Sequence, residues 1–283
     1  MARVQSSVRD VAKRITPAPV MRARQRVLER RAVASARPFV ALAAAWAGGV
    51  AGKRVLEVGA DQLGRNLRAA VELGAAEAVG VNPAMAATTF GPSAHLLRED
   101  AGHLPFDDGH FDVVITDSTF EHVHDLPGVL AELHRVTGPG GTMLAHYGPI
   151  WSAPYGHHLW VEHGGRAWTY WDVVLPSWCH LLDEPEAVAR FCTGQLGHDV
   201  RLTDAIVRWV FEDEGQNRLL FDDYAKITGA SPWHVEWFKG YDTELAPRYR
   251  AQHDVRERHD ELQRWWPDRD GWLFDGITMV VTA

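Results

Sequence analysis

The sequence predicts an α/β fold with a mostly parallel sheet, and three features of the chain support this prediction. Between Lys53 and Tyr147, short apolar runs alternate with helical patterns, as they do in consecutive βαβ units. A glycine-containing turn follows the first of these runs. Near the end of the chain, the β-branched run Ile277–Thr282 predicts a strand that returns to the same sheet.

Each predicted strand is a short run of apolar and β-branched residues. In chain order the strands are Arg54–Gly59, Ala78–Val81, Ala94–Leu97, Asp112–Thr116, Thr142–Tyr147 and Ile277–Thr282. A helix over Leu67–Leu73 follows the first strand. A second helix, Leu126–Val136, has its apolar residues on one face at a period of 3.6 residues. The apolar run Phe39–Ala47 is too short to span a membrane and predicts a buried helix.

The pattern changes after Gly148, and this change suggests how the chain is divided. Eleven of the 12 tryptophans lie beyond Gly148, and the alternation of strand and helix is lost there. Helical patterns return at Asn217–Ile227 and Arg248–Trp266. We therefore expect four parts: an N-terminal helical arm (1–52), a Rossmann-like cofactor-binding core (53–150), a substrate-side insertion (151–270) and a final strand that rejoins the core (271–283).

Composition excludes several classes of protein. The chain of 283 residues is 46% apolar and 23% charged, as in soluble globular proteins. No apolar run reaches the roughly 18 residues that a membrane span needs, and the N-terminus lacks the pattern of a secretory signal. The two cysteines, Cys179 and Cys192, form no disulfide framework. We therefore expect a cytoplasmic protein without membrane association.

The N-terminal segment is strongly basic. Residues 1–31 carry nine basic and two acidic side chains, a formal charge of +7 in a chain whose total charge is −8. Such a segment suits an acidic partner or the acidic remainder of the same chain. No nucleic-acid-binding motif accompanies it, so we do not expect a nucleic-acid partner. The sequence is compatible with a homo-oligomer and leaves the oligomeric state open.

The loop after the first strand has the position of a ligand-binding loop. In parallel α/β sheets, ligands bind at the carboxyl ends of the strands, where glycines let the backbone approach the ligand. Here the stretch VLEVGADQLGRN, Val55–Asn66, carries Gly59 and Gly64, with Asp61 where a middle glycine would stand. Because glycine-containing turns are common after strands, this loop alone is weak evidence for a cofactor.

The segment Arg98–Leu144 carries a more specific pattern. It contains, in order, a D-A-x-x-L-P-F stretch, an F-D-x-V strand, an E-H pair, an E-L-x-R-V helix and a P-G-G turn. The matching residues are Asp100, Ala101, Leu104, Pro105, Phe106, Phe111, Asp112, Val114, Glu121, His122, Glu132, Leu133, Arg135, Val136, Pro139, Gly140 and Gly141. This segment resembles the class I S-adenosylmethionine-dependent methyltransferases that act on small molecules.

The resemblance implies a fold and a cofactor. The fold would be a Rossmann-like, seven-stranded, mostly parallel sheet flanked by helices, with an N-terminal helical arm and a helical insertion before the last strands. The cofactor would be S-adenosyl-L-methionine. The resemblance covers Lys53–Tyr147 well and the final strand Ile277–Thr282 loosely.

Position by position, the resemblance also implies cofactor-binding residues. Glu57 and the Gly59–Gly64 loop would hold the methionine portion, Asn82 the ribose, and Asp100 with the Ala101 backbone the adenine, while Thr116–Ser118 would line the sulfonium end. The full set is Glu57, Gly59, Ala60, Asp61, Gly64, Asn82, Asp100, Ala101, Asp117 and Ser118. Asn82 replaces the usual acidic residue and therefore offers a weaker ribose contact.

Methyl transfer needs alignment of the reacting groups and often a base that removes a proton from the acceptor. Histidine is the usual base, and the candidates are His157, His146 and His122, in that order. His157 comes first because the run WSAPYGHHLW resembles bacterial methyltransferases of polysaccharide and specialised metabolism. The histidines show no compact metal-ligand spacing, so we expect no metal site.

The expected activity is therefore methyl transfer to a small-molecule acceptor, such as a specialised metabolite or a sugar-like compound. Two alternatives stay open at this point. One is a protein of the same fold that catalyses a cyclisation or decarboxylation, and the other is a binding protein that has lost its cofactor. The altered glycine loop motivates the second alternative.

Overall fold

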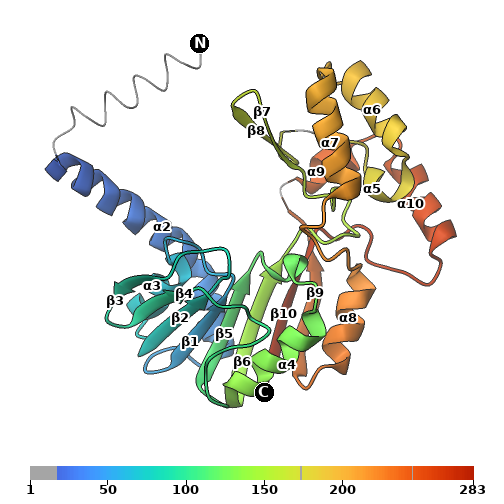
Figure 1. Cartoon of the computed structure of the whole chain (residues 1–283). Coiled ribbons are helices and arrows are strands. Elements are labelled where there is room, and N and C mark those ends of the chain that lie inside the picture. The colour runs from blue at the N-terminus through green and yellow to red at the C-terminus, as the bar shows by residue number, and fades with distance from the viewer. Residues whose placement is uncertain (1–17, 173, 244) are drawn as a thin grey trace.

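The computed structural model describes residues 18–172, 174–243 and 245–283. They form an α/β body with a smaller cap that stands over the carboxyl edge of the parallel strands (Figure 1). The first 17 residues of the predicted N-terminal arm, with part of its basic charge, lie outside the described residues.

Within the described residues, the central sheet has eight strands in the order β3-β4-β2-β1-β5-β6-β10-β9. Their bounds are β1 (Arg54–Val58), β2 (Glu77–Val81), β3 (Thr88–Gly91), β4 (Ala94–Leu97), β5 (Phe111–Asp117), β6 (Thr137–Tyr147), β9 (His234–Tyr241) and β10 (Gly276–Thr282). The strands β4, β2, β1, β5 and β6 run parallel, whereas β3, β10 and β9 pair antiparallel. The predicted α/β class is confirmed, but the predicted number of seven strands is wrong.

The sequence pattern predicts neither β3 nor β9. β3 has four residues and lies at the sheet edge, where its side chains are only partly buried. β9 lies at the opposite edge, and most of its side chains are exposed. Edge strands of this kind lack the alternation of apolar and polar residues by which a strand is recognised in a sequence.

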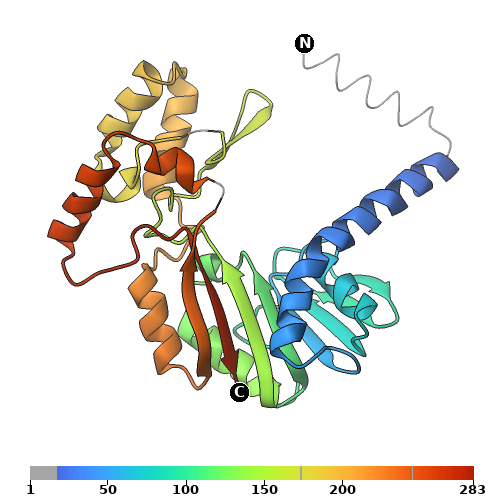
Figure 2. The same ribbon diagram turned by 180° about the vertical axis from the view of Figure 1, so that it is seen from behind.

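Helices cover both faces of the sheet (Figures 1 and 2). On one face, α2 (Ala18–Trp46) packs on α3 (Arg65–Glu72), and a core around Val40, Leu67 and Ile115 joins them to the strands. On the other face, α4 (Leu126–Val136) and α8 (Phe221–Ala230) pack on a second core. The short helix η1 (Phe120–His122) follows β5.

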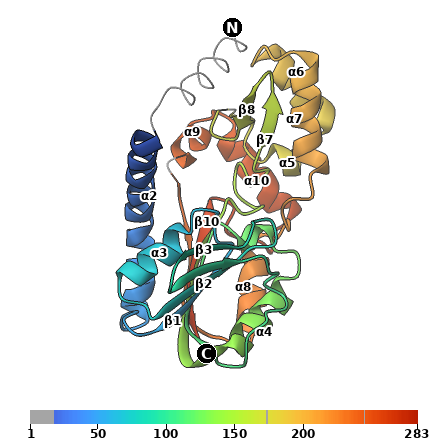
Figure 3. The same cartoon turned by 60° about the vertical axis from the view of Figure 1, so that its left-hand side comes forward.

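The helix α2 is amphipathic at its carboxyl end rather than buried all round. The predicted helix over Phe39–Ala47 is present down to Trp46, and Val40 and Ala43 are buried. In contrast, the side chains of Leu42 and Trp46 are 46% and 44% exposed, because only one face of the helix packs on the sheet. Figures 1 and 3 show the N-terminal part of α2 extending beyond the sheet. No helix in the described part of the chain combines the length and the apolar character that crossing a membrane requires.

The cap is formed from segments between β6 and β10. Its elements are the hairpin β7 (Trp160–His163) and β8 (Arg166–Thr169) with the helices α5 (Cys179–Leu182), α6 (Pro185–Gly194), α7 (Val200–Glu212), α9 (Ala246–Arg250) and α10 (Val255–Trp265). Trp178 is fully buried and its Nε1 donates to the Ser152 carbonyl at 2.9 Å, whereas Trp160 and Trp171 are largely exposed. The chain returns to the body between these helices as α8 and β9.

Candidate functional site

A cavity of about 600 Å³ lies at the carboxyl edge of the sheet. It is lined by residues that follow four parallel strands, among them Gly59 after β1, Asn82 after β2, Asp100 after β4 and Ser118 after β5. The strand order reverses between β1 and β5, and this is where ligands bind in open α/β sheets. The volume lies within the range of about 300–1,000 Å³ that is typical of small-molecule sites.

Two glycines of the loop after β1 are required by their surroundings. Gly59 has a φ of 80°, and a Cβ on it would lie 2.0 Å from the Oγ1 atom of Thr119. Gly64 has a φ of 58°, and its Cβ would lie 2.3 Å from the ring of Phe90. The loop therefore needs glycine at both positions, although the second is one residue later than in the usual pattern.

Asp61 shapes this loop where a middle glycine would stand. Its Oδ1 accepts a hydrogen bond from the Leu63 backbone N–H at 2.6 Å, and its Oδ2 accepts one from the Arg65 Nε at 2.6 Å. The first bond closes a side-chain turn of the kind that aspartate favours. Because the second pairs its charge with Arg65, Asp61 does not face the cavity, and neither Asp61 nor Gly64 is among the lining residues.

Beneath the loop, Glu57 is buried, and its Oε1 accepts a hydrogen bond from the Asn66 Nδ2 at 2.7 Å. Its Oε2 has no partner among the described residues. Burial raises the pKa of this carboxyl to about 8. Neither Glu57 nor the buried Ala60 lines the cavity, so Glu57 would act on a ligand there from behind the loop.

Asn82 joins two of the loops around the cavity. Its Nδ2 donates to the Ala60 carbonyl at 3.1 Å, and its Oδ1 accepts from the Ala84 backbone N–H at 2.9 Å. The side chain therefore fixes the loop after β1 against the loop after β2. The Oδ1 atom keeps a second lone pair with which it can accept a further hydrogen bond.

The cavity lining is acidic. Asp100 and Glu99 lie after β4, next to the buried Ala101, and Asp125 caps the N-terminus of α4. Asp100 accepts from the Gly102 backbone N–H at 2.8 Å through one of its oxygens, so the other is available to a ligand. Neither lysine nor arginine is among the lining residues. This charge suits a cationic or neutral ligand better than a phosphate.

Of the three histidines proposed as bases, the structure brings His122 to the cavity. Its Nδ1 lies 2.7 Å from the Gly215 carbonyl oxygen. Since a carbonyl only accepts, Nδ1 must carry the proton, and in the neutral ring Nε2 holds the free lone pair. The ring stacks on His158 at 5.3 Å, and burial lowers the pKa of His158 to about 3.

His157 and His146 lie outside the cavity lining. The Nδ1 of His157 accepts from the Leu159 backbone N–H at 3.2 Å, so its proton sits on Nε2 and no lone pair is free. Burial also lowers the pKa of His157 well below its usual value. His146 is half-buried, with its Nδ1 2.8 Å from the Thr278 hydroxyl and its ring stacked on Tyr241.

The end of β5 carries an unusual backbone conformation. Ser118 lines the cavity with a φ of 52°, in the left-handed region that favours glycine. Its backbone N–H donates to the His146 carbonyl at 2.8 Å, which holds the turn in place. The preceding Asp117 is exposed beside the cavity, and partial desolvation raises its pKa. Such outliers are often found at ligand-binding sites.

Sequence reasoning missed four polar residues of the cavity lining: Glu99, Thr119, His124 and Asp125. All four adjoin predicted site residues or the E-H pair. Their proximity in sequence to those positions was the signal that could have identified them. The Nε2 of His124 donates to the Glu214 carbonyl at 3.0 Å, parallel to the bond made by His122.

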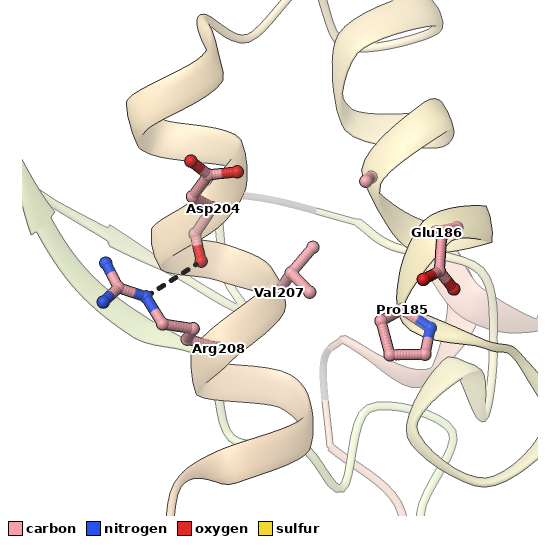
Figure 4. A pocket seen from close by; sticks show the side chains of 6 residues that line it. Pro185, Glu186, Asp204, Val207 and Arg208 are labelled. Atoms are coloured by element: carbon pink, nitrogen blue, oxygen red, sulfur yellow. Dashed lines mark hydrogen bonds between the residues drawn. The ribbon is translucent and has the colours of Figure 1, made fainter.

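A second pocket of about 500 Å³ lies on the cap, between α6 and α7 (Figure 4). Its polar side chains are Glu186, Asp204 and Arg208, and the Arg208 Nε donates to the Asp204 carbonyl at 3.4 Å. No residue predicted for the site lines this pocket. Among the described residues, no group of three or more histidine, cysteine or acidic side chains is arranged to hold a metal ion.

Comparison with known proteins shows a similarity to methyltransferases over the segment that contains this cavity. Residues 56–145 match a family model described as a methyltransferase domain. An uncharacterized methyltransferase of Mycobacterium sp. (strain KMS) is 37% identical over 86 residues, which cover 29% of this chain and 34% of that protein. The match thus spans about a third of the length of this mycobacterial relative.

Two further comparisons cover more of the chain. The chloroplastic tocopherol O-methyltransferase of Arabidopsis thaliana is 26% identical over 215 residues, which cover 66% of this chain and 59% of that protein. The crystal structure of an S-adenosylmethionine-dependent methyltransferase from Mesorhizobium loti aligns over 83% of this chain and 92% of its own, with 17% identity and a TM-score of 0.47.

The matched segment contains β1 to β6 almost completely, and with them the loops that line the cavity after β1, β2, β4 and β5. It also contains the ordered motifs from Asp100 to Gly141. Over residues 56–145, the chain is thus similar to methyltransferase domains.

Proposed function

We propose that the protein transfers a methyl group from S-adenosyl-L-methionine to a small-molecule acceptor. The observation that carries this proposal is the acidic cavity of about 600 Å³ within the methyltransferase domain. The cofactor bears an ammonium and a sulfonium group, and the carboxylates of Glu99, Asp100 and Asp125 complement such a ligand. The lack of lysine and arginine in the lining disfavours a dinucleotide, whose pyrophosphate needs basic or N–H-rich surroundings.

The residues around the cavity would divide the cofactor among them. Asp100 accepts from the adenine amino group, the free lone pair of the Asn82 Oδ1 meets the ribose, and the backbone at Gly59 approaches the methionine portion. Glu57 supports that portion through the loop. When bound, the cofactor supplies an electrophilic methyl group, which leaves the protein to align the acceptor and remove its proton.

We assign the proton-accepting role to His122. It lines the cavity, it is exposed, and its Nε2 lone pair is free because Nδ1 is bonded to the Gly215 carbonyl. His157 lacks all three properties: it lies outside the lining, it is buried, and its lone pair is already used by Leu159. The tautomer and the position together favour His122 over His157.

Calorimetric titration with S-adenosylhomocysteine tests the proposal. We expect binding in the micromolar range, and we expect Asp100→Ala to weaken it by roughly 10- to 100-fold, because a hydrogen bond to a charged group is worth about 1.5–3 kcal/mol. The matched control is Asp107→Ala, since Asp107 is exposed and precedes β5, at the opposite edge of the sheet. Absence of binding at millimolar ligand would refute the proposed function.

A further inference from the structure

All six tyrosines of the chain lie at the junction between the carboxyl edge of the sheet and the cap. They are Tyr147 at the end of β6, Tyr155 and Tyr170 beside the β7–β8 hairpin, Tyr224 on α8, Tyr241 at the end of β9 and Tyr249 on α9. Tyr147 and Tyr224 form one ring pair, with centroids 5.1 Å apart, and Tyr155 stacks on both Tyr170 and Tyr249, at 5.6 and 4.7 Å. Tyr241 stacks on His146 at 4.1 Å. We call this group the tyrosine junction.

A continuous row of rings connects the tyrosine junction to the cofactor cavity. His122, which lines the cavity, stacks on His158 at 5.3 Å. His158 meets the edge of Tyr170 at 5.0 Å, and Tyr170 stacks on Tyr155 at 5.6 Å. A molecule that extends from the cavity toward the cap would therefore lie along aromatic rings. No tyrosine lines the cavity itself, so the junction adjoins the cofactor site without being part of it.

Tyr241 and Glu121 meet across the backbone of Gly148. A Cβ on Gly148 would lie 3.1 Å from the Tyr241 hydroxyl, and the Gly148 N–H donates to the Glu121 Oε1 at 3.3 Å. The other oxygen of Glu121 is buried and has no partner among the described residues, and the same is true of the Tyr147 hydroxyl. The Glu121 carboxyl thus lies against Gly148, which follows Tyr147 in the chain and adjoins the Tyr241 hydroxyl.

The junction contains three carboxyl groups, and in the described part of the chain none of them forms an ion pair with a lysine or arginine. Asp117 is the neighbour of His146 across β5 and β6, and the His146 ring stacks on Tyr241 with centroids 4.1 Å apart. Glu121 accepts from the Gly148 N–H, and Asp275 has one buried oxygen without a partner among the described residues. Desolvation raises the pKa of all three carboxyls.

The nearest guanidinium groups are engaged elsewhere. Arg65 is paired with Asp61, Arg250 with Asp242, Arg248 with the Trp171 carbonyl, and Arg218 with the Phe211 and Asp213 carbonyls. The histidines that face the junction offer no charge in return, because burial lowers the pKa of both His146 and His158. The junction is thus an aromatic and acidic environment that lacks a cation.

We propose that the methyl acceptor is an amine, which binds as an ammonium ion at the tyrosine junction between Asp117 and the rings of Tyr170 and Tyr241. This inference rests on the proposed function. Ammonium groups interact favourably both with carboxylates and with aromatic faces, the latter by about 0.5–2 kcal/mol. An acceptor that carries a phosphate or carboxylate at this position would instead be repelled by Asp117.

The chemistry balances with the groups that are present. The ammonium ion gives one proton to the His122 Nε2 and so regains the lone pair on its nitrogen. That lone pair forms the new nitrogen–carbon bond, while the electrons of the methyl–sulfur bond stay on sulfur. The methylated amine then carries the positive charge that the sulfonium loses, and the proton on His122 passes to solvent.

Binding measurements test the inference without turnover. The probes are 2-phenylethylamine, 2-phenylethanol and 3-phenylpropanoate, which share a ring and differ in charge, titrated into the full chain saturated with S-adenosylhomocysteine. We expect the amine to bind at least about tenfold more tightly than the other two, which corresponds to about 1.4 kcal/mol. Asp117→Asn and Tyr170→Leu should each reduce this preference to about threefold or less, whereas the control Asp107→Asn should leave it unchanged.

Several outcomes would overturn the inference. They are equal or tighter binding of the alcohol or the carboxylate, no binding of any probe, and an amine preference that survives both Asp117→Asn and Tyr170→Leu. If Asp117→Asn weakened the binding of S-adenosylmethionine relative to that of S-adenosylhomocysteine and left the binding of the amine unchanged, the Asp117 carboxylate would contact the cofactor instead of the acceptor. Retained binding of S-adenosylhomocysteine shows that each variant is folded. It also separates failure of this inference from failure of the proposed function, in which S-adenosylhomocysteine does not bind at all.

Discussion

At the scale of single residues, the contact between Gly59 and Thr119 determines the shape of the cofactor loop. Both residues line the cavity, and any side chain on Gly59 would overlap the Thr119 hydroxyl. The usual pattern of three glycines is thus reduced here to the two positions that sterics require, while Asp61 closes the turn between them through its own side chain.

We therefore expect Gly59→Ala to lower the free energy of unfolding far more than an alanine substitution at a glycine that has a positive φ but no close neighbour. A positive φ costs a non-glycine residue about 1–2 kcal/mol, and the overlap with Thr119 adds roughly 1–3 kcal/mol. The matched control is Gly140→Ala, since Gly140 has a φ of 75° but no atom within 4 Å of its Cβ position. Denaturant unfolding and titration with S-adenosylhomocysteine measure both effects. Equal losses in the two variants would contradict the steric explanation.

The residues of the site divide into those that the sequence could predict and those that it could not. Gly59, Asn82, Asp100 and Ser118 follow strands whose carboxyl ends lie together in a parallel sheet, and the resemblance to a family singled them out among the residues there. His157 was proposed from a local motif in the cap. Its burial and its tautomer depend on the packing of the cap, which no short-range pattern encodes.

At the scale of elements, the same contrast separates the body from the cap. The helix α4 was predictable because its buried residues repeat with a period of 3.6, and the Asp125 side chain caps its first turn. The cap has several small cores instead of one. Polar contacts between residues far apart in the sequence join the helices of the cap.

One such contact joins α5 to α10. The Arg258 guanidinium makes two bonds to Asp183, at 2.6 and 3.2 Å, and its Nε donates to the Ser177 carbonyl at 2.6 Å. The Arg258 side chain is 14% exposed and that of Asp183 is 21% exposed, so this paired geometry is only weakly screened by solvent.

We expect Arg258→Ala to destabilise the cap by roughly 2–4 kcal/mol, because it leaves a largely buried carboxylate unpaired. The control is Arg37→Ala, since the Arg37–Glu72 pair is 3.7 Å long, with both side chains 54% exposed, and such pairs contribute at most about 1 kcal/mol. Limited proteolysis should then cut the cap before the body, while binding of S-adenosylhomocysteine persists. Uniform cleavage of cap and body would show that Arg258 stabilises the whole molecule.

At the scale of the whole molecule, buried titratable groups make stability depend on pH in two opposite ways. Burial raises the pKa of Glu57 and of Glu121 to about 8. Between the usual glutamate pKa and pH 8, the folded state therefore binds more protons than the unfolded state, and stability falls as pH rises. Burial lowers the pKa of His158 to about 3 and of His180 to about 4, so these groups make stability rise up to the usual histidine pKa.

The two effects oppose each other below about pH 6.5 and cease to do so above it. From there to pH 8, Glu57 and Glu121 stay largely protonated in the folded state and are ionised in the unfolded state, so stability still falls as pH rises. Each group contributes a slope of at most about 1.4 kcal/mol per pH unit. The free energy of unfolding should thus be greatest near pH 6.5 and decline toward pH 8.

Urea unfolding at pH 5 to 8.5 measures this dependence, and Glu121→Gln isolates one of its sources. Glutamine keeps an acceptor for the Gly148 N–H but does not titrate, so the decline between pH 6.5 and 8 should become shallower by up to about 1.4 kcal/mol per pH unit. The control Glu72→Gln, at a half-exposed surface pair, should leave the slope as it is. A decline of unchanged slope in Glu121→Gln would mean that Glu121 is ionised in the folded protein. The unpartnered oxygen at the tyrosine junction would then carry a full negative charge before any acceptor binds.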